Sequence, residues 1–184
     1  GINAHELDST IYDLLVASRP DIRTVIHETT VEGLDIVPAN IDLSAAEVQL
    51  VNEVAREQAL KRVLRPVLDE YDVILVDCQP SLGLLTINAL TASHGVIIPL
   101  ETEFFALRGV ALLVETVERV KDRLNATLEI DGILATMVDS RTLHSREVLE
   151  RLEQAFGEQL FDTRIRRTIK FPDASVANEP ITSY

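Results

Sequence analysis

An apolar run that ends in a carboxylate is the part of this sequence best suited to chemistry. The stretch at 69–83 reads DEYDVILVDCQPSLG, so the run stops at Asp77 and is followed by Pro80 and Gly83. We predict a buried strand over 72–77, which would present Asp77 at the carboxyl end of a sheet, where open α/β sheets bind ligands. A carboxylate there can orient the hydration shell of a nucleotide-bound Mg²⁺. The alternative is that Asp77 only caps the following turn or helix.

The elements that would position this carboxylate follow from the hydrophobic pattern. Two further runs rich in β-branched residues predict strands over 95–100 and 131–138, and a shorter run at 33–40 is a further candidate. Because the long runs lack polar alternation, we expect helices on both faces of the sheet. Helical spacing predicts helices from Ser44 to Leu64, Leu84 to Ala92, Ala106 to Leu124 and Ser145 to Phe156. This order predicts an α/β fold with a doubly wound, mostly parallel sheet flanked by helices, in a single domain over 1–184.

Capping signals set the ends of two of these helices. The Ser44 hydroxyl can cap the first helix while Glu47, three residues later, completes a capping box. Pro66 should end or kink that helix. Gly157 should stop the helix that ends at Phe156.

Length and composition favour a globular protein of a reducing compartment. The chain has 184 residues, enough for one domain with a sizeable core, and Cys78 is its only cysteine. The sequence contains neither a run of about 20 apolar residues nor a signal-peptide pattern. We therefore expect a cytoplasmic protein with no membrane partner. Because the sequence opens on Gly1 and closes without a helix-ending signal, we also expect a domain incomplete at both ends.

The charge of the chain is unevenly distributed. The formal net charge is −13, which by itself disfavours binding to DNA. From Arg141 to Lys170, however, there are seven basic and five acidic residues, and the run TRIRRTIK at 163–170 contains four positive charges and no acid. This run is either a solvated basic face or a surface for phosphate contacts, which need only Lys and Arg on one side.

Several separated motifs resemble those of a known family. DCQPSLGLLTINAL, at 77–90, resembles the switch II stretch of the ParA/Soj chromosome-partitioning ATPases, P-loop NTPases with a deviant Walker A motif. PLETEFFALRGVALL, at 99–113, resembles the family's P-x-x-x-E-x-x-A-L-x-G signature. TMVDSRT, at 136–142, resembles the family's strand end and loop on the adenine side.

The resemblance implies roles for individual residues. Asp77 would be the catalytic acid that holds the Mg²⁺ shell. The stretch that senses the γ-phosphate and lines an ATP-dependent dimer interface would comprise Gln79, Pro80, Ser81 and Gly83. Met137 and Asp139 would lie beside the adenine ring, and Arg167 keeps its family position at the nucleotide.

The sequence departs from the family in two places. Where relatives commonly read I-P-R-N, this chain has Arg166 and Thr168 on either side of Arg167, so the base pocket should differ. The family's P-loop, K-G-G-x-G-K-S/T, is absent, since none of the seven glycines is followed by lysine. In relatives that loop precedes the position of Gly1, and a last helix follows that of Tyr184. We therefore expect the 184 residues alone not to bind or hydrolyse ATP.

For the parent protein, the resemblance implies a Mg-ATP-dependent dimerisation switch in chromosome or plasmid partitioning. ATP and Mg²⁺ would be its cofactors, a second copy and a ParB-like stimulator of hydrolysis its protein partners, and the nucleoid its location. Non-specific DNA contacts would fall to Arg167 and Lys170, followed by Arg164, Arg166, Arg141 and Arg146. Two alternatives are a MinD-like division-site regulator and a non-enzymatic interaction module that has lost the P-loop.

Overall fold

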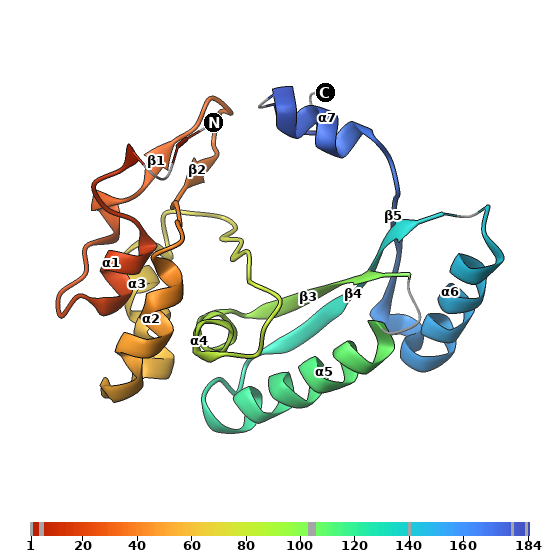
Figure 1. The fold of residues 1–184 in the computed structure, drawn as a ribbon. Coiled ribbons are helices and arrows are strands. Elements are labelled where there is room, and N and C mark those ends of the chain that lie inside the picture. Colours follow the sequence, from red (N-terminus) through yellow and green to blue (C-terminus); the bar gives the residue numbers. More distant parts are fainter. Residues whose placement is uncertain (1, 4–5, 103–105, 140, 178, 183) are drawn as a thin grey trace. The chain divides into compact units, whose positions relative to one another are not determined.

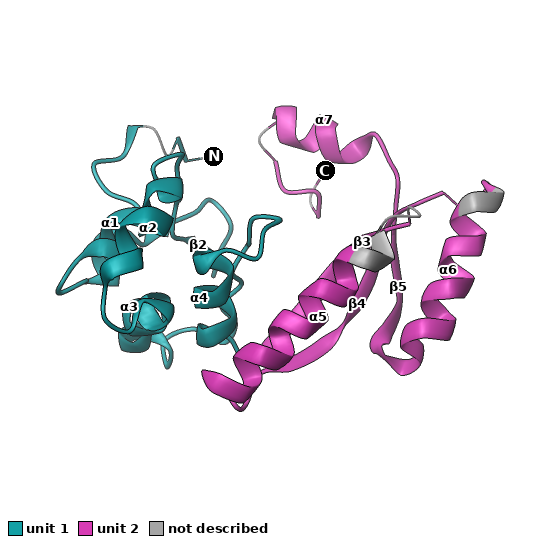
Figure 2. Cartoon of the chain, turned by 60° about the horizontal axis from the view of Figure 1, so that its bottom comes forward, with its two compact units in different colours: residues 1–93 teal, residues 94–184 magenta. Residues whose placement is uncertain are grey.

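The structure is a computed structural model that describes the chain except residues 1, 4–5, 103–105, 140, 178 and 183 and the side chains of 106–108, 143 and 144. The chain divides into two compact units, Gly1–Ser93 and His94–Tyr184 (Figure 2). Each unit has a hydrophobic core of its own. Within the described residues, no helix combines the length and the apolar character needed to cross a membrane.

The first unit consists of short helices and a two-stranded ribbon (Figure 1). Strands β1 (His27–Glu28) and β2 (Asp35–Ile36) pair antiparallel. The α-helices are α1 (Ile11–Val16), α2 (Leu43–Gln49), α3 (Ala59–Leu64) and α4 (Leu84–Ala92). Turns of 3₁₀ helix lie between them, η2 (Ile22–Thr24), η3 (Leu50–Asn52), η4 (Arg56–Gln58) and η5 (Arg65–Val67). The candidate strand at 33–40 is therefore reduced to the two residues of β2.

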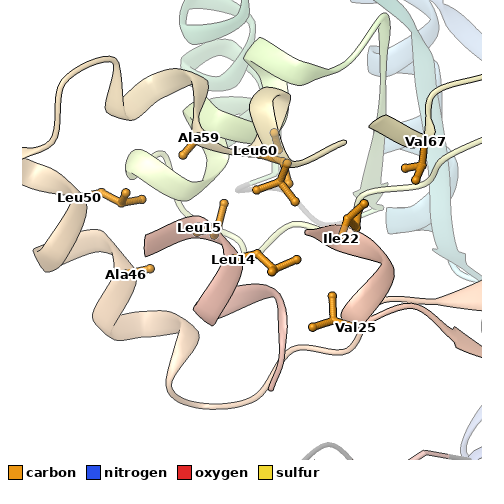
Figure 3. Packing of buried hydrophobic residues seen from close by; sticks show 11 residues of the cluster. Leu14, Leu15, Ile22, Val25, Ala46, Leu50, Ala59, Leu60 and Val67 are labelled. Atoms are coloured by element: carbon orange, nitrogen blue, oxygen red, sulfur yellow. The ribbon is translucent and has the colours of Figure 1, made fainter. Parts of the chain in front are cut away.

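Apolar side chains from the four α-helices and from η2, η3 and η5 meet in the core of the first unit (Figure 3). Leu14 and Leu15 of α1 lie against Leu60 of α3, and Val25 is fully buried. The other members of the core are Ile22, Ala46, Leu50, Ala59, Val63, Val67 and Ala89. Each fully buried leucine or valine stabilises the unit by about 1.5–3 kcal/mol relative to an exposed one.

Asn88 of α4 is a buried polar residue whose side-chain amide is fully used. Its oxygen accepts the backbone N–H of Leu60 (3.1 Å), and its nitrogen donates to the carbonyls of Arg56 (2.8 Å) and Leu84 (3.0 Å). A buried amide with its partners in place avoids the cost of an unsatisfied polar group. Asn88 therefore joins α4 to η4 and to the start of α3.

The long helix predicted from Ser44 to Leu64 is wrong in its extent and in its cap. Helix α2 ends at Gln49, and the chain passes through Ala55, whose φ of 55° is left-handed, before η4 and α3 begin. The N-cap of α2 is Asp42, and the Ser44 hydroxyl donates to the carbonyl of Ile41 (2.9 Å). A left-handed residue with a Cβ costs about 1–2 kcal/mol. Burial of side chains from both halves in one core offsets that cost.

The strand predicted over 72–77 is also wrong. These residues belong to no helix or strand, and the exposed fractions of Val73 to Val76 run from 37% at Ile74 to 86% at Leu75. A strand requires ladder hydrogen bonds from a neighbour. No strand among the described residues pairs with this segment. Asp77 consequently does not stand at the end of a strand.

The second unit is built on a parallel sheet with the strand order β3-β4-β5 (Figure 1). Its elements are β3 (Gly95–Glu101), α5 (Ala106–Arg123), β4 (Glu129–Val138), α6 (Leu143–Phe156), η6 (Gly157–Gln159), β5 (Leu160–Arg166) and α7 (Lys170–Ala177). These elements, together with α4, confirm the strands predicted at 95–100 and 131–138 and the three later helices. They also confirm the α/β class with a parallel sheet flanked by helices.

Helices α5 and α6 pack against the sheet and form the core of the second unit. Ile98 and Leu100 of β3 are buried in it, whereas Ile97 is 51% exposed. The helices contribute Val110 from α5 and Val148, Leu149 and Leu152 from α6. We expected helices to cover both faces of the sheet. In β3 only the face that bears Ile98 and Leu100 is covered, and the face that bears Ile97 is not. Gly157, with a φ of 50°, ends α6 as predicted.

Candidate nucleotide site

Asp77 lies exposed in the loop that leads into α4. Within the part of the chain that the structure describes, its carboxylate accepts no hydrogen bond and forms no ion pair. Mg²⁺ is usually held through one or two carboxylates together with substrate phosphates, and it keeps several of its waters. A single unpaired carboxylate fits that chemistry. The described residues contain no cluster of three or more His, Cys, Asp or Glu side chains that could hold a metal ion unaided.

The residues after Asp77 form a turn closed by hydrogen bonds around Ser81. The Ser81 N–H donates to the carbonyl of Gln79 (2.8 Å), and its hydroxyl accepts the side-chain amide of Gln79 (2.9 Å) and, more weakly, the N–H of Gly83 (3.4 Å). The Ser81 carbonyl accepts the hydroxyl of Thr86 in α4 (2.7 Å). Pro80 restricts the same turn because its φ is fixed. The structure thus brings together the four residues predicted to sense a phosphate.

Glu47 of α2 was missed by the sequence analysis as a site residue. It is partly buried against this turn, and its Oε1 accepts the side-chain amide of Gln79 and the backbone N–H of Leu85, both at 3.3 Å. Leu85 is the second residue of α4, so its N–H is one of those that a helix leaves without an internal partner. A Cβ on Gly83 would collide with the same oxygen. Glu47 therefore caps α4 rather than its own helix.

The thiol of Cys78 is poorly suited to act as a nucleophile. Desolvation by its surroundings and, to a smaller extent, the charge of Asp77 raise the pKa of the Cys78 thiol. A raised pKa lowers the fraction of reactive thiolate at neutral pH. The thiol of Cys78 is therefore not activated, although the residue is exposed.

In the second unit, the carboxyl end of β4 gathers Met137, Asp139 and Arg167. Met137 is half-exposed and has a left-handed φ of 52°, where the pairing of β4 with β5 shifts register. The N–H of Arg167 donates to the carbonyl of Val138 (3.2 Å), and its charge helps to lower the pKa of Asp139. Non-glycine residues in strained conformations concentrate at functional sites. The three residues predicted to contact the nucleotide in this unit are therefore neighbours.

Asp139 is held by Arg141 from its own loop. The Arg141 guanidinium donates from Nε to Oδ1 (2.9 Å) and from Nη2 to Oδ2 (2.8 Å), and the Arg141 backbone N–H donates to Oδ1 (3.1 Å). Such two-point pairing is stronger and more directional than a single contact. It lowers the pKa of Asp139 from its ordinary 3.8 to about 2.

We expect Arg141→Ala to return the pKa of Asp139 part of the way towards 3.8, because the side-chain hydrogen bonds of Arg141, the largest cause of the shift, are lost while the backbone N–H at position 141 still donates to Asp139. With a folded-state pKa below the ordinary one, ionised Asp139 stabilises the fold above pH 3.8, and this contribution is lost as the pH falls through about 2. Carbon-13 NMR titration of the Asp139 carboxyl group would measure the shift. Arg146→Ala is the control, and an unchanged pKa in Arg141→Ala would refute the assignment.

The predicted DNA-binding residues all lie exposed in the second unit, but they differ in whether an acid already pairs with them. Arg141 pairs with Asp139, and Arg164 pairs with Glu153 (2.7 Å). Among the described residues, no acid forms an ion pair with the three side chains of Arg146, Arg166 and Lys170. A pocket of about 490 Å³ is lined by Val138, Arg146, Leu149, Asp162, Arg164 and Arg166. Three of the predicted arginines thus share one depression.

Comparison with known proteins places this geometry in a family. A family described as "AAA domain" matches residues 1–130. The sporulation initiation inhibitor protein Soj of Bacillus subtilis (strain 168) is 44% identical over 184 residues, which cover 100% of this chain and 72% of that protein. The chain belongs to the ParA/Soj family. This membership confirms the resemblance inferred from the motifs.

Two further matches cover all or nearly all of the chain. An uncharacterized protein of Mycobacterium tuberculosis (strain ATCC 25618 / H37Rv) is 58% identical over 184 residues, and this chain spans only 58% of its length. The crystal structure of cobyrinic acid a,c-diamide synthase from Mycobacterium smegmatis with bound ADP and magnesium has a TM-score of 0.84 and 36% identity, over 97% of this chain and 75% of that one. A relative of this fold therefore binds nucleotide and magnesium.

Proposed function

We propose that the chain is part of a Mg-ATP-dependent dimerisation switch that acts in chromosome or plasmid partitioning. The observation that carries this proposal is the turn from Gln79 to Gly83, which bears the ParA/Soj switch II motif and follows an unpaired carboxylate, Asp77. In P-loop NTPases a carboxylate helps to hold Mg²⁺ at the phosphates, and a polar side chain such as a glutamine orients the attacking water. The family membership supports the same role.

The two units carry different groups that are suited to binding a nucleotide, and each unit is considered by itself. In the first, Asp77 would hold water of the magnesium shell, and Gln79 and Ser81 would orient groups at the γ-phosphate. When bound, Mg²⁺ would neutralise charge on the phosphate oxygens. In the second, Asp139 and Arg167, with Met137 beside the base, would contact the nucleoside. Arg166 and Thr168 would shape the base pocket differently from that of relatives.

The dimer would use its unpaired basic side chains to bind DNA without sequence preference. Phosphate contacts require cations that no internal acid already neutralises. That condition favours Arg146, Arg166 and Lys170 over Arg141 and Arg164. A ParB-like partner would stimulate hydrolysis and so release the dimer, in the cytoplasm and at the nucleoid. A net charge of −13 suits a partner that presents a basic segment.

The proposal is tested with the full-length protein and with the 184 residues alone, both titrated with ATP in the presence and absence of Mg²⁺. We expect the full-length protein to bind Mg-ATP and to change from monomer to dimer in sedimentation velocity. Because the chain lacks a P-loop sequence, we expect the 184 residues alone to bind at least about a hundredfold more weakly. A full-length protein that neither binds ATP nor dimerises with it would contradict the proposal.

A further inference from the structure

We propose that Glu47 is a positioning residue for the turn from Gln79 to Gly83. Its carboxylate would hold this turn in the shape in which Gln79 and Ser81 can act on the bound nucleotide. The inference rests on the proposed nucleotide function of the turn. It adds a residue from a different helix, 32 positions before Gln79 in the sequence.

Glu47 contacts both the turn and the helix that follows it. Oε1 accepts the Gln79 amide and the Leu85 N–H at 3.3 Å each, and it lies where a side chain on Gly83 would have to be. The Gln79 amide is shared with the Ser81 hydroxyl (2.9 Å), so Glu47 and Ser81 together fix its direction. Without Glu47, the Gln79 side chain keeps only one of these two partners.

A glutamate suits the position of residue 47 beside the N-terminus of α4. A carboxylate stabilises the positive end of a helix and satisfies an N–H that the helix itself leaves free. Helix α4 begins at Leu84, directly after the turn, so this stabilisation anchors one end of the turn. The competing role for Glu47, as the second half of a capping box with Ser44, does not occur, because Asp42 is the N-cap of α2 and the Ser44 hydroxyl donates to Ile41.

Gly83 provides a second way to disturb the same contact. Its φ of −75° and ψ of −174° are available to any residue, so an alanine there would bring no backbone strain. The collision of its Cβ with the Glu47 carboxylate is the specific cost. Gly83→Ala should therefore push Glu47 away from the turn. In a Glu47→Ala background the same substitution finds the space empty.

The experiment uses the full-length protein and four variants, Glu47→Ala, Glu47→Gln, Gly83→Ala and the double Ala variant, with Glu53→Ala as the control. Glu53 is an exposed glutamate that follows η3. We expect Glu47→Ala to lower the kcat of ATP hydrolysis about tenfold or more, with the KM within about threefold, because misplaced groups lower the rate of the chemical step. Glu47→Gln should recover most of the rate, since its amide oxygen can still accept both hydrogen bonds.

Hydrogen exchange of the Leu85 amide supplies a readout independent of hydrolysis. Its exchange should accelerate in Glu47→Ala and in Gly83→Ala but not in Glu53→Ala. Unchanged exchange, or an unchanged kcat in Glu47→Ala beside an active wild type, would overturn the inference. In the double variant, exchange of the Leu85 amide should be no faster than in Glu47→Ala, because Gly83→Ala then has no carboxylate to displace, and a further acceleration would also overturn the inference. A wild type that does not hydrolyse ATP would instead contradict the proposed function, while the exchange data would still decide whether Glu47 holds the turn.

Discussion

In the full-length protein, Asp77→Asn is expected to lower the rate of ATP hydrolysis by about a hundredfold or more. The amide keeps the shape of the carboxylate and loses the charge that would order water on Mg²⁺. Because Asp77 is exposed and supports no other described residue through a hydrogen bond or ion pair, the fold should be unaffected. The measurement is steady-state phosphate release at several magnesium concentrations, together with circular dichroism to verify folding.

Asp72→Asn is the matched control for this substitution. Asp72 is exposed, carries the same charge and lies at the other end of the same apolar run. We expect its rate to stay within about twofold of wild type, as is usual for surface changes away from a site. Equal rates for Asp77→Asn and Asp72→Asn would refute a magnesium role for Asp77.

The second large effect concerns DNA. Replacing Arg146, Arg166 and Lys170 together by alanine should weaken binding of the ATP-bound full-length protein to non-specific duplex about a hundredfold at low salt. Each lost phosphate contact lowers the slope of log K against log salt by about 0.9, so the slope should fall by about 2.7. Arg167 is left in place because it belongs to the proposed nucleotide site. Fluorescence anisotropy at several salt concentrations gives both quantities.

A triple variant in α5 controls for net charge. Replacing Arg119, Lys121 and Arg123 by alanine removes the same three charges from another part of the second unit. Because phosphate contacts depend on where the charges lie, this variant should keep most of the salt slope. Equal slopes in the two triple variants would show that only net charge matters and would remove the assigned surface.

The sequence predicted the second unit better than the first. Strands β3 and β4 consist of long apolar runs with β-branched residues, and α5 and α6 have clear helical spacing, so local pattern and tertiary structure agree. Strand β5, Leu160–Arg166, was missed because four of the seven positions in LFDTRIR are polar or charged, and the same four lie exposed. The interruption of the predicted helix at Ala55 has no local signal in the sequence, since neither Gly nor Pro occurs there.

The sequence predicted the parts of the candidate site whose residues are close together in the sequence, and it missed the part that comes from a distant helix. Gln79 to Gly83 form one turn because Pro80, Ser81 and a glycine adjoin each other in the sequence. Glu47 reaches the turn only because α2 and α4 pack together, 38 residues apart. For the apolar run before Asp77, the sequence predicted a strand that the structure does not contain. High β-propensity alone does not make a strand, and no strand among the described residues pairs with this run.

The buried amide of Asn88 links helix α4 to η4 and to the start of α3 through hydrogen bonds. The three hydrogen bonds of the Asn88 amide resist separation, since Asn88 is buried and breaking them would leave its polar atoms without a partner. Helix α4, which starts at the turn, cannot slide without pulling the backbone at Arg56 and Leu60 with it. A rearrangement of the turn that shifts α4 would therefore have to break these hydrogen bonds or move η4 and the start of α3 with it.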